Sequence, residues 1–253
     1  MSTFIEGIGE KIMIGIGTLI NVGGIIIGGL FGLLFGNFMK PRVQDTLMKA
    51  NGLCVLFLGI AGTLEQMVSV SDGRLVSSGT MMMILSLSIG ALIGEWINLD
   101  QKMEQFGEWL KQKTGNAKDK MFVDGFVTAS LTVSIGAMAI VGALQDGLTG
   151  NYSTLLTKAI LDLIIICVMT ASMGKGCIFS AIPVALLQGC VTLLARSIEP
   201  VMTETALSNL SFVGNMLIFC VGVNLFFENT RIKVANMLPA IIIAVVWAFL
   251  PFA

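Results

Sequence analysis

A lysine and an aspartate stand four residues apart inside one of the most apolar stretches of the chain. Lys158 and Asp162 interrupt the segment TKAILDLIIICVM, which covers residues 157–169. Residues at this spacing share one face of a helix and can form an ion pair, although a long lysine side chain can instead reach the membrane interface. Intramembrane carboxylates commonly mark ion or proton pathways. Asp162 is therefore our leading candidate for chemistry, with a purely structural ion pair as the alternative.

Other polar residues near helix ends or interruptions could line the same path. Pro183 cannot donate a backbone hydrogen bond and so interrupts a helix, and transporters often place their sites beside interrupted helices. Carboxylates and amides at the end of an apolar run more often cap a helix than take part in transport. The candidate ion or substrate path consists of Asp162, Lys158, Ser180, Pro183, Gln188, Gln145, Asp146 and Glu228.

Several classes of chemistry find no support in the residue types. Histidine is absent, which removes the commonest general base and the commonest metal ligand. The five cysteines stand singly in apolar runs and do not have the spacing of metal ligands. The net charge is −1 and the basic residues are scattered, so no basic patch is available for nucleic acid. We expect a protein that is not an enzyme and that has no metal site, no cofactor and no nucleic-acid partner.

The elements that must position these residues are membrane-spanning helices. The chain has 253 residues, of which 55% are hydrophobic and only 12% charged, whereas soluble domains carry about 25% charged residues. Apolar runs of about 20 residues, long enough to cross a bilayer, recur from end to end. The composition predicts an all-α polytopic membrane protein, one transmembrane domain over residues 1–253, embedded in a lipid bilayer. The eight candidate spans are 12–36, 48–68, 76–96, 122–144, 153–173, 176–195, 208–228 and 234–252.

The distribution of positive charge predicts the orientation of these spans. With the N-terminus outside, eleven of the fifteen basic residues fall in cytoplasmic loops, as the positive-inside rule expects. Eight spans then leave both termini outside, provided that residues 174–176 form a tight hairpin. The largest cytoplasmic loop, 99–120, has apolar residues at helical spacing, which indicates an amphipathic helix at the interface.

The first and last thirds of the chain resemble each other. Units 12–97 and 176–252 flank a central pair of spans, 122–173, and aligning the two units needs only small gaps. Because the first unit starts outside and the second inside, the repeat would be inverted across the membrane, an arrangement common in transporters. The matched pairs are Pro41 with Pro200, Gly59 with Gly222, Glu65 with Glu228, and Arg74 with Arg231.

Four glycines in the first span recur every fourth residue and so follow one helix face. They are Gly24, Gly28, Gly32 and Gly36. Small residues on one face let another helix approach closely in lipid. The partner is either another span of the same chain, which we favour, or a second copy in a homo-oligomer.

Long stretches of the sequence resemble a known family. The segments TASLTVSIGAMAIVGALQDGLTGNYSTLLTKAILD, TASMGKGCIFSAIPVALLQGCVTLLA and GTLINVGGIIIGG are similar to the domain-of-unknown-function 554 family of YdfK/YqgA-like bacterial membrane proteins. The resemblance implies a multi-pass protein of the bacterial inner membrane with an internally repeated, all-helical fold. It supplies no substrate and no reaction. The matching residues include Gly136, Gly142, Gln145, Asp146, Gly147, Lys158, Asp162, Ser180, Pro183 and Gln188.

Two functions from different classes remain. The leading hypothesis is a transporter or channel for an ion or small solute that passes Asp162, because that carboxylate lies in the membrane and the repeat points to a transporter fold. The alternative is a membrane scaffold or assembly partner that transports nothing. The alternative predicts a stable complex with other proteins and no polar cavity near Asp162.

Overall fold

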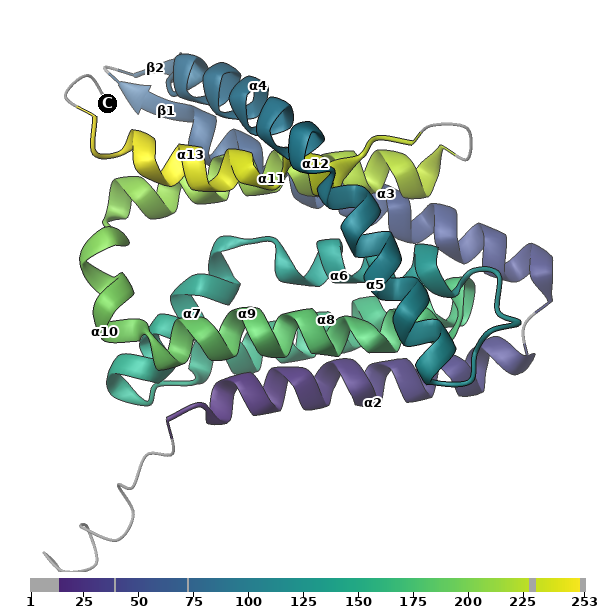
Figure 1. The fold of residues 1–253 in the computed structure, drawn as a ribbon. Helices are drawn as coiled ribbons and strands as arrows, with labels where there is room; N and C mark the ends of the chain where they lie inside the picture. The colour runs from purple at the N-terminus through teal and green to yellow at the C-terminus, as the bar shows by residue number, and fades with distance from the viewer. Residues whose placement is uncertain (1–13, 39, 72, 228–230, 251–253) are drawn as a thin grey trace, which may run out of the picture.

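The computed structural model describes residues 14–38, 40–71, 73–227 and 231–250, and these are almost entirely helical (Figure 1). The elements in chain order are α2 (Ile16–Phe38), α3 (Pro41–Met67), β1 (Val68–Ser71), β2 (Arg74–Ser77), α4 (Thr80–Ile97), α5 (Leu99–Lys113), α6 (Phe122–Ser134), α7 (Ala137–Thr149), α8 (Ser153–Met173), the 3₁₀ helix Lys175–Ser180, α9 (Ala181–Leu193), α10 (Ala195–Ile198), the 3₁₀ helix Glu199–Val201, α11 (Glu204–Phe226), α12 (Val234–Met237) and α13 (Pro239–Trp247).

Most of the expected membrane spans are present as long apolar helices. Within the described residues, six segments are long and apolar enough to cross a bilayer. A seventh span arises if α6 and α7, which meet at an angle of 62°, are counted together. The last expected span is shorter, because its apolar helical segment covers only Val234–Trp247. The structure therefore confirms an all-α polytopic membrane protein.

The bundle is built on close helix pairs that glycines make possible. α2 runs parallel to α8, because Gly24 faces Ala159 and Gly32 faces Cys167. Added Cβ atoms on α2 would meet the main chain of α8, so only glycine permits this approach. The glycine face of the first span is thus covered by α8 of the same chain, which leaves no room there for a second copy.

A second pair, α3 and α11, runs antiparallel. Gly52 lies against Phe226, and Gly59 lies against Phe219. α4 packs antiparallel to α12 and α13, with Gly90 against Ala240. The proposed repeat equates α3 with α11 and α4 with α13. Helices equated by an inverted repeat should run antiparallel, as these pairs do, but the inverted repeat stays a prediction.

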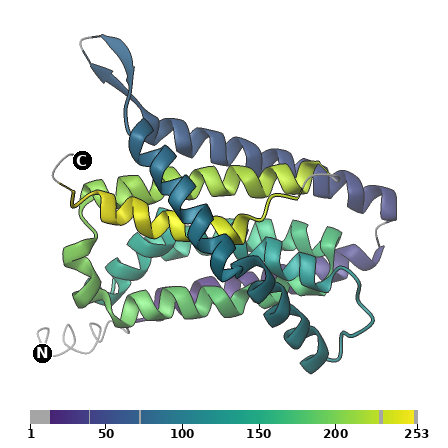
Figure 2. The same cartoon turned by 45° about the horizontal axis from the view of Figure 1, so that its top comes forward.

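The directions of the helices place the two ends of the described chain on the same side. α2 begins, and α13 ends, at the end of the bundle that carries α10, which we call the α10 end (Figure 1). The opposite end carries the loop between α5 and α6, and we call it the α5 end. A short β-hairpin of β1 and β2, which the sequence analysis did not anticipate, projects from the α10 end (Figure 2).

The expected hairpin at residues 174–176 is present and needs only one linking residue. α8 ends at Met173, and Gly174 turns the chain with φ = 88° before the 3₁₀ helix starts at Lys175. A side chain would strain this positive φ, which explains the glycine. The chain then returns antiparallel to α2. Ile178 of the 3₁₀ helix lies against Gly29, and Thr192 of α9 meets Thr18, about three turns nearer the start of α2.

The expected helix interruption at Pro183 is absent, and a different pair of helices is interrupted instead. α9 begins at Ala181, so Pro183 occupies the first helical turn, where a missing N–H removes no intrahelical hydrogen bond. The true break separates α6 from α7. Ile135 is extended, and Gly136 has φ = 144° and ψ = 148°. The glycine accommodates a backbone conformation that other residues rarely adopt.

Candidate functional site

The ammonium of Lys158 and the carboxylate of Asp162 form an ion pair inside the bundle. The Nζ atom lies 2.9 Å from Oδ1, and the two residues are only 8% and 3% exposed. α8 continues without interruption through both residues, so the pair spans one turn of a regular helix. Lys158 therefore binds Asp162 and does not extend to the membrane interface.

A second helix adds an amide to this ion pair. Asn21 of α2 is fully buried, and its side chain lies close to the carboxylate of Asp162. No hydrogen bond of normal geometry satisfies its amide atoms, and Oδ2 of Asp162 is likewise unpaired. The sequence analysis missed Asn21, although an asparagine inside the apolar run LINVGG was a usable signal.

A third helix brings Gln188 to the same level. Thr18 of α2 and Thr192 of α9 meet with 3.4 Å between their hydroxyl oxygens. From that contact, Asn21 lies about one turn along α2 and Gln188 one turn back along α9. Because the two helices are antiparallel, these steps lead in the same direction. Gln188 is 1% exposed, and both of its amide atoms are unpaired.

Four buried polar residues thus lie at about one level of the bundle, and we call Asn21, Lys158, Asp162 and Gln188 the polar cluster. Five of its buried polar atoms have no hydrogen-bond partner among the described residues. Each such atom costs about 1–3 kcal/mol when left unsatisfied, and native proteins satisfy most buried polar groups through protein, water or ions. The cluster therefore retains polar atoms that the described residues do not satisfy.

Gln145 and Asp146 form hydrogen bonds with residues outside the polar cluster. Asp146 is fully buried, and its Oδ2 accepts a 3.1 Å hydrogen bond from the backbone N–H of Gly17. That N–H belongs to the first turn of α2, so the carboxylate caps the positive end of this helix. Gln145 accepts a 2.7 Å hydrogen bond from the hydroxyl of Thr154.

The other expected path residues lie away from the cluster. The hydroxyl of Ser180 donates a 2.7 Å hydrogen bond to the carbonyl oxygen of Cys177 and so closes the 3₁₀ helix. Pro183 lines an apolar cavity instead of a polar path. Glu228 lies outside the described residues. Of the eight expected path residues, the structure thus pairs Lys158 with Asp162 and places Gln188 on a third helix at about the level of Asn21.

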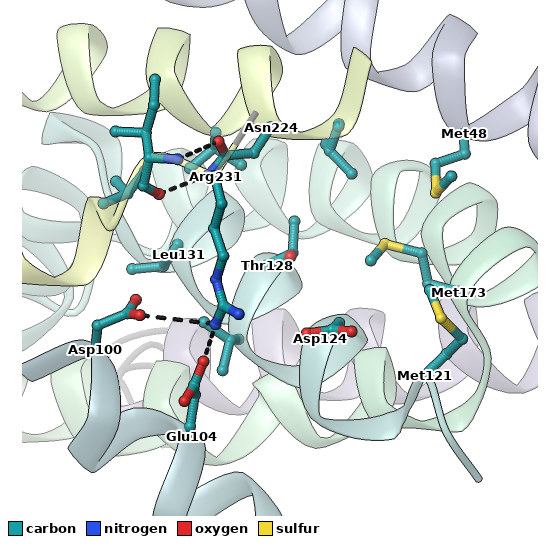
Figure 3. Close-up of a pocket in the computed structure, with 15 residues that line it drawn as sticks. Met48, Asp100, Glu104, Met121, Asp124, Thr128, Leu131, Met173, Asn224 and Arg231 are labelled. Atoms are coloured by element: carbon teal, nitrogen blue, oxygen red, sulfur yellow. Dashed lines mark hydrogen bonds and ion pairs between the residues drawn. The ribbon is translucent and has the colours of Figure 1, made fainter. Parts of the chain in front are cut away.

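A charged cavity of about 340 Å³ opens at the α5 end. Asp100 and Glu104 of α5 and Asp124 of α6 contribute carboxylates to its lining. Arg231 extends across the cavity, where its guanidinium forms ion pairs with Glu104 and, at 3.8 Å, with Asp100 (Figure 3). We call this space the charged cavity; residues far apart in the sequence build it.

One face of α8 leads from the charged cavity to the polar cluster. Met173 lines the cavity, beside Met48 and Met121 (Figure 3), and Met169, Ile166 and Asp162 follow on the same helix face at intervals of three or four residues. Met169 and Ile166 are fully buried. Met169 and Ile166 thus lie between the cavity and Asp162 along this helix face.

The described residues contain no group of three histidine, cysteine, aspartate or glutamate side chains that could hold a metal ion. The carboxylates of the charged cavity accordingly do not form a site of that kind. Together these carboxylates attract cations, and two of them pair with Arg231.

Long apolar helices around a buried polar cluster define a polytopic helical membrane protein. The family described as "Protein of unknown function (DUF554)" matches residues 16–249, and the chain belongs to this family. It is 30% identical to the uncharacterized membrane protein YdfK of Bacillus subtilis (strain 168) over 92% of this chain and 95% of that protein.

A second relative is the uncharacterized protein YqgA of Escherichia coli (strain K12). It is 26% identical over 90% of this chain and 94% of that protein. No solved structure matches the chain. The comparisons thus confirm the family inferred from the sequence, and they attach no activity to the site.

Proposed function

We propose that this protein, rather than being an enzyme, is a transporter or channel that carries a proton or a small cation past Asp162. The observation that supports the proposal is the polar cluster, where a carboxylate and two amides bury five unpaired polar atoms in the interior of the bundle. A purely structural ion pair would not need the two additional amides. Intramembrane carboxylates with unsatisfied neighbours are typical of ion and proton paths.

The charge balance of the cluster suggests how binding would occur. Lys158 and Asp162 together carry no net charge, so a cation would gain little binding energy from the carboxylate while it is paired with the ammonium. Movement of the Lys158 side chain would free Asp162. The carboxylate and the amide oxygens of Asn21 and Gln188 would then offer oxygen ligands, which hard cations prefer.

The charged cavity is the proposed approach to the cluster. Its three carboxylates raise the local concentration of cations, and Arg231 neutralises part of this charge. Met169 and Ile166 separate the cavity from Asp162. Alternating access would require these two side chains to move, as gates do in transporters with a central site.

We also propose the orientation in the bacterial inner membrane. The α5 end carries the lysines of α5 and of the α5–α6 loop, and basic loops accumulate on the cytoplasmic side. The α5 end would then face the cytoplasm. The α10 end, with the two ends of the described chain, would face outward.

Ion flux through reconstituted protein tests the proposal. We expect liposomes that contain the purified protein to dissipate an imposed proton, sodium or potassium gradient faster than empty liposomes. A Glu65→Gln variant, changed at an exposed carboxylate of α3, should retain this flux. Protein that is folded and yet indistinguishable from empty liposomes for all three cations would refute the proposal.

The scaffold hypothesis makes the opposite prediction. Asp162 and Gln188 do not line the charged cavity, and a closed cluster also suits a protein that transports nothing. A scaffold would give no flux and would copurify with a stoichiometric partner after mild solubilisation. The flux measurement and the purification together distinguish the two classes.

A further inference from the structure

An apolar cavity of about 470 Å³ lies on the side of α6 opposite the charged cavity. Leu131 of α6 borders both cavities, so this helix is the wall between them. α5, α9, α11 and α13 complete the lining, with Phe106, Leu187 and Leu210 among the apolar side chains. Phe106 and Leu187 are partly exposed, so the cavity opens on the surface of the bundle.

The inner wall of this apolar cavity carries polar groups without partners. Ser130 and Ser134 contribute to the lining, and the hydroxyl of each is buried without a hydrogen bond. The α6–α7 break at Gly136 lies in the same wall. Such groups at membrane depth are tolerated where a ligand, protein or water can meet them.

A lysine, Lys102, lies at the rim of the cavity. Lys102 shares one face of the amphipathic helix α5 with Leu99, Met103 and Phe106, and all four line the cavity. The Lys102 side chain is exposed, and it forms no ion pair with the described residues. An amphipathic helix at a membrane interface commonly places its lysines at the level of lipid headgroups.

We propose that the apolar cavity binds an anionic glycerophospholipid of the surrounding bilayer. Its phosphate would meet Lys102, and an acyl chain would lie against Phe106, Leu131 and Leu187. The two ester carbonyls are the acceptors that a glycerophospholipid brings below its phosphate, and rotation about χ1 would turn the hydroxyls of Ser130 and Ser134 toward them. The charge, the hydroxyls and the apolar lining of the cavity thus each have a counterpart in this lipid.

Retention of lipid by the delipidated, full-length protein in detergent tests the proposal. Phosphatidylglycerol and phosphatidylcholine with identical acyl chains would be added separately, and bound lipid would be counted by native mass spectrometry. We expect preferential retention of phosphatidylglycerol. Lys102→Gln should lower its affinity about fivefold, the contribution of one lysine near an anionic headgroup. Leu187→Trp, which fills the cavity from a partly exposed position, should reduce the retention of both lipids.

Lys113→Gln is the matched control, because Lys113 lies on the same helix, is exposed and does not line the cavity. It should retain phosphatidylglycerol as the wild type does. Equal retention of the two lipids, an equal loss in Lys113→Gln and Lys102→Gln, or undiminished retention in Leu187→Trp would each overturn the proposal. Ion flux does not enter this measurement, so its outcome is independent of the proposed transport.

Discussion

The ammonium of Lys158 lies 2.9 Å from a carboxylate oxygen of Asp162, and the two side chains are almost completely buried in α8. Removal of one partner of a buried ion pair leaves an uncompensated charge, which costs about 3–5 kcal/mol. Lys158→Met should therefore lower stability strongly in a thermal or denaturant unfolding experiment in detergent.

The double variant Lys158→Met with Asp162→Leu should recover most of this loss, because replacing both partners by apolar groups is often neutral. If the double variant instead lost as much stability as the two single variants together, the result would contradict the pairing of Lys158 with Asp162. The comparison also separates stability from transport, since the double variant should fold and yet lack flux.

The contact between α2 and α8 gives a second prediction. A methyl group at Gly28 would overlap the carbonyl oxygen of Leu163, whereas a methyl group at Gly23 meets nothing within 4 Å. Gly28→Ala should cost about 1–3 kcal/mol through overpacking, and Gly23→Ala should be close to wild type. Equal melting temperatures for the two variants would show that α2 does not pack on α8 in this register.

The capping of α2 by Asp146 gives a third prediction. Asp146→Ala removes the acceptor for the N–H of Gly17 and should lower stability by about 0.5–2 kcal/mol. Asp146→Asn retains an oxygen acceptor and should be affected less. Folded Asp146→Asn protein should conduct ions at the wild-type rate, because Asp146 lies outside the polar cluster. A loss of flux at unchanged melting temperature would instead place this carboxylate on the path.

The orientation can be measured by labelling single cysteines. In a variant whose five native cysteines are replaced, Arg74→Cys in the β-hairpin should react with a membrane-impermeant maleimide on intact cells. Lys113→Cys in α5 should react only after the cells are opened. The reverse pattern would invert the orientation while leaving the fold unchanged.

The sequence predicted features that depend on local pattern. Apolar length located α8, and the spacing of Gly24 and Gly32 indicated the close helix pair. The four-residue interval allowed a pair of Lys158 with Asp162, but it left open a lysine that reaches the membrane interface. These features follow from helix periodicity. They require no knowledge of which helices are neighbours in space.

The features that were missed depend on tertiary neighbours or on backbone conformation. Gly136 interrupts a helix within an apolar run that looks continuous in the sequence. Pro183 suggested a break, but it occupies the first turn of a helix, where proline is accommodated. Asn21 gains its importance only because α2 lies beside α8. The charged cavity combines Asp100, Asp124 and Arg231, whose proximity no spacing along the chain reveals.

The most direct test of the central claim is the cation flux of Asp162→Asn relative to wild type, in liposomes that contain equal amounts of folded protein. The amide keeps the shape of the carboxylate but has neither its charge nor its proton. The variant should be less stable than wild type, because Lys158 loses its buried partner. We predict that the flux of the protein that is folded falls to the level of empty liposomes. Flux at the wild-type rate would contradict the role of Asp162 in ion passage.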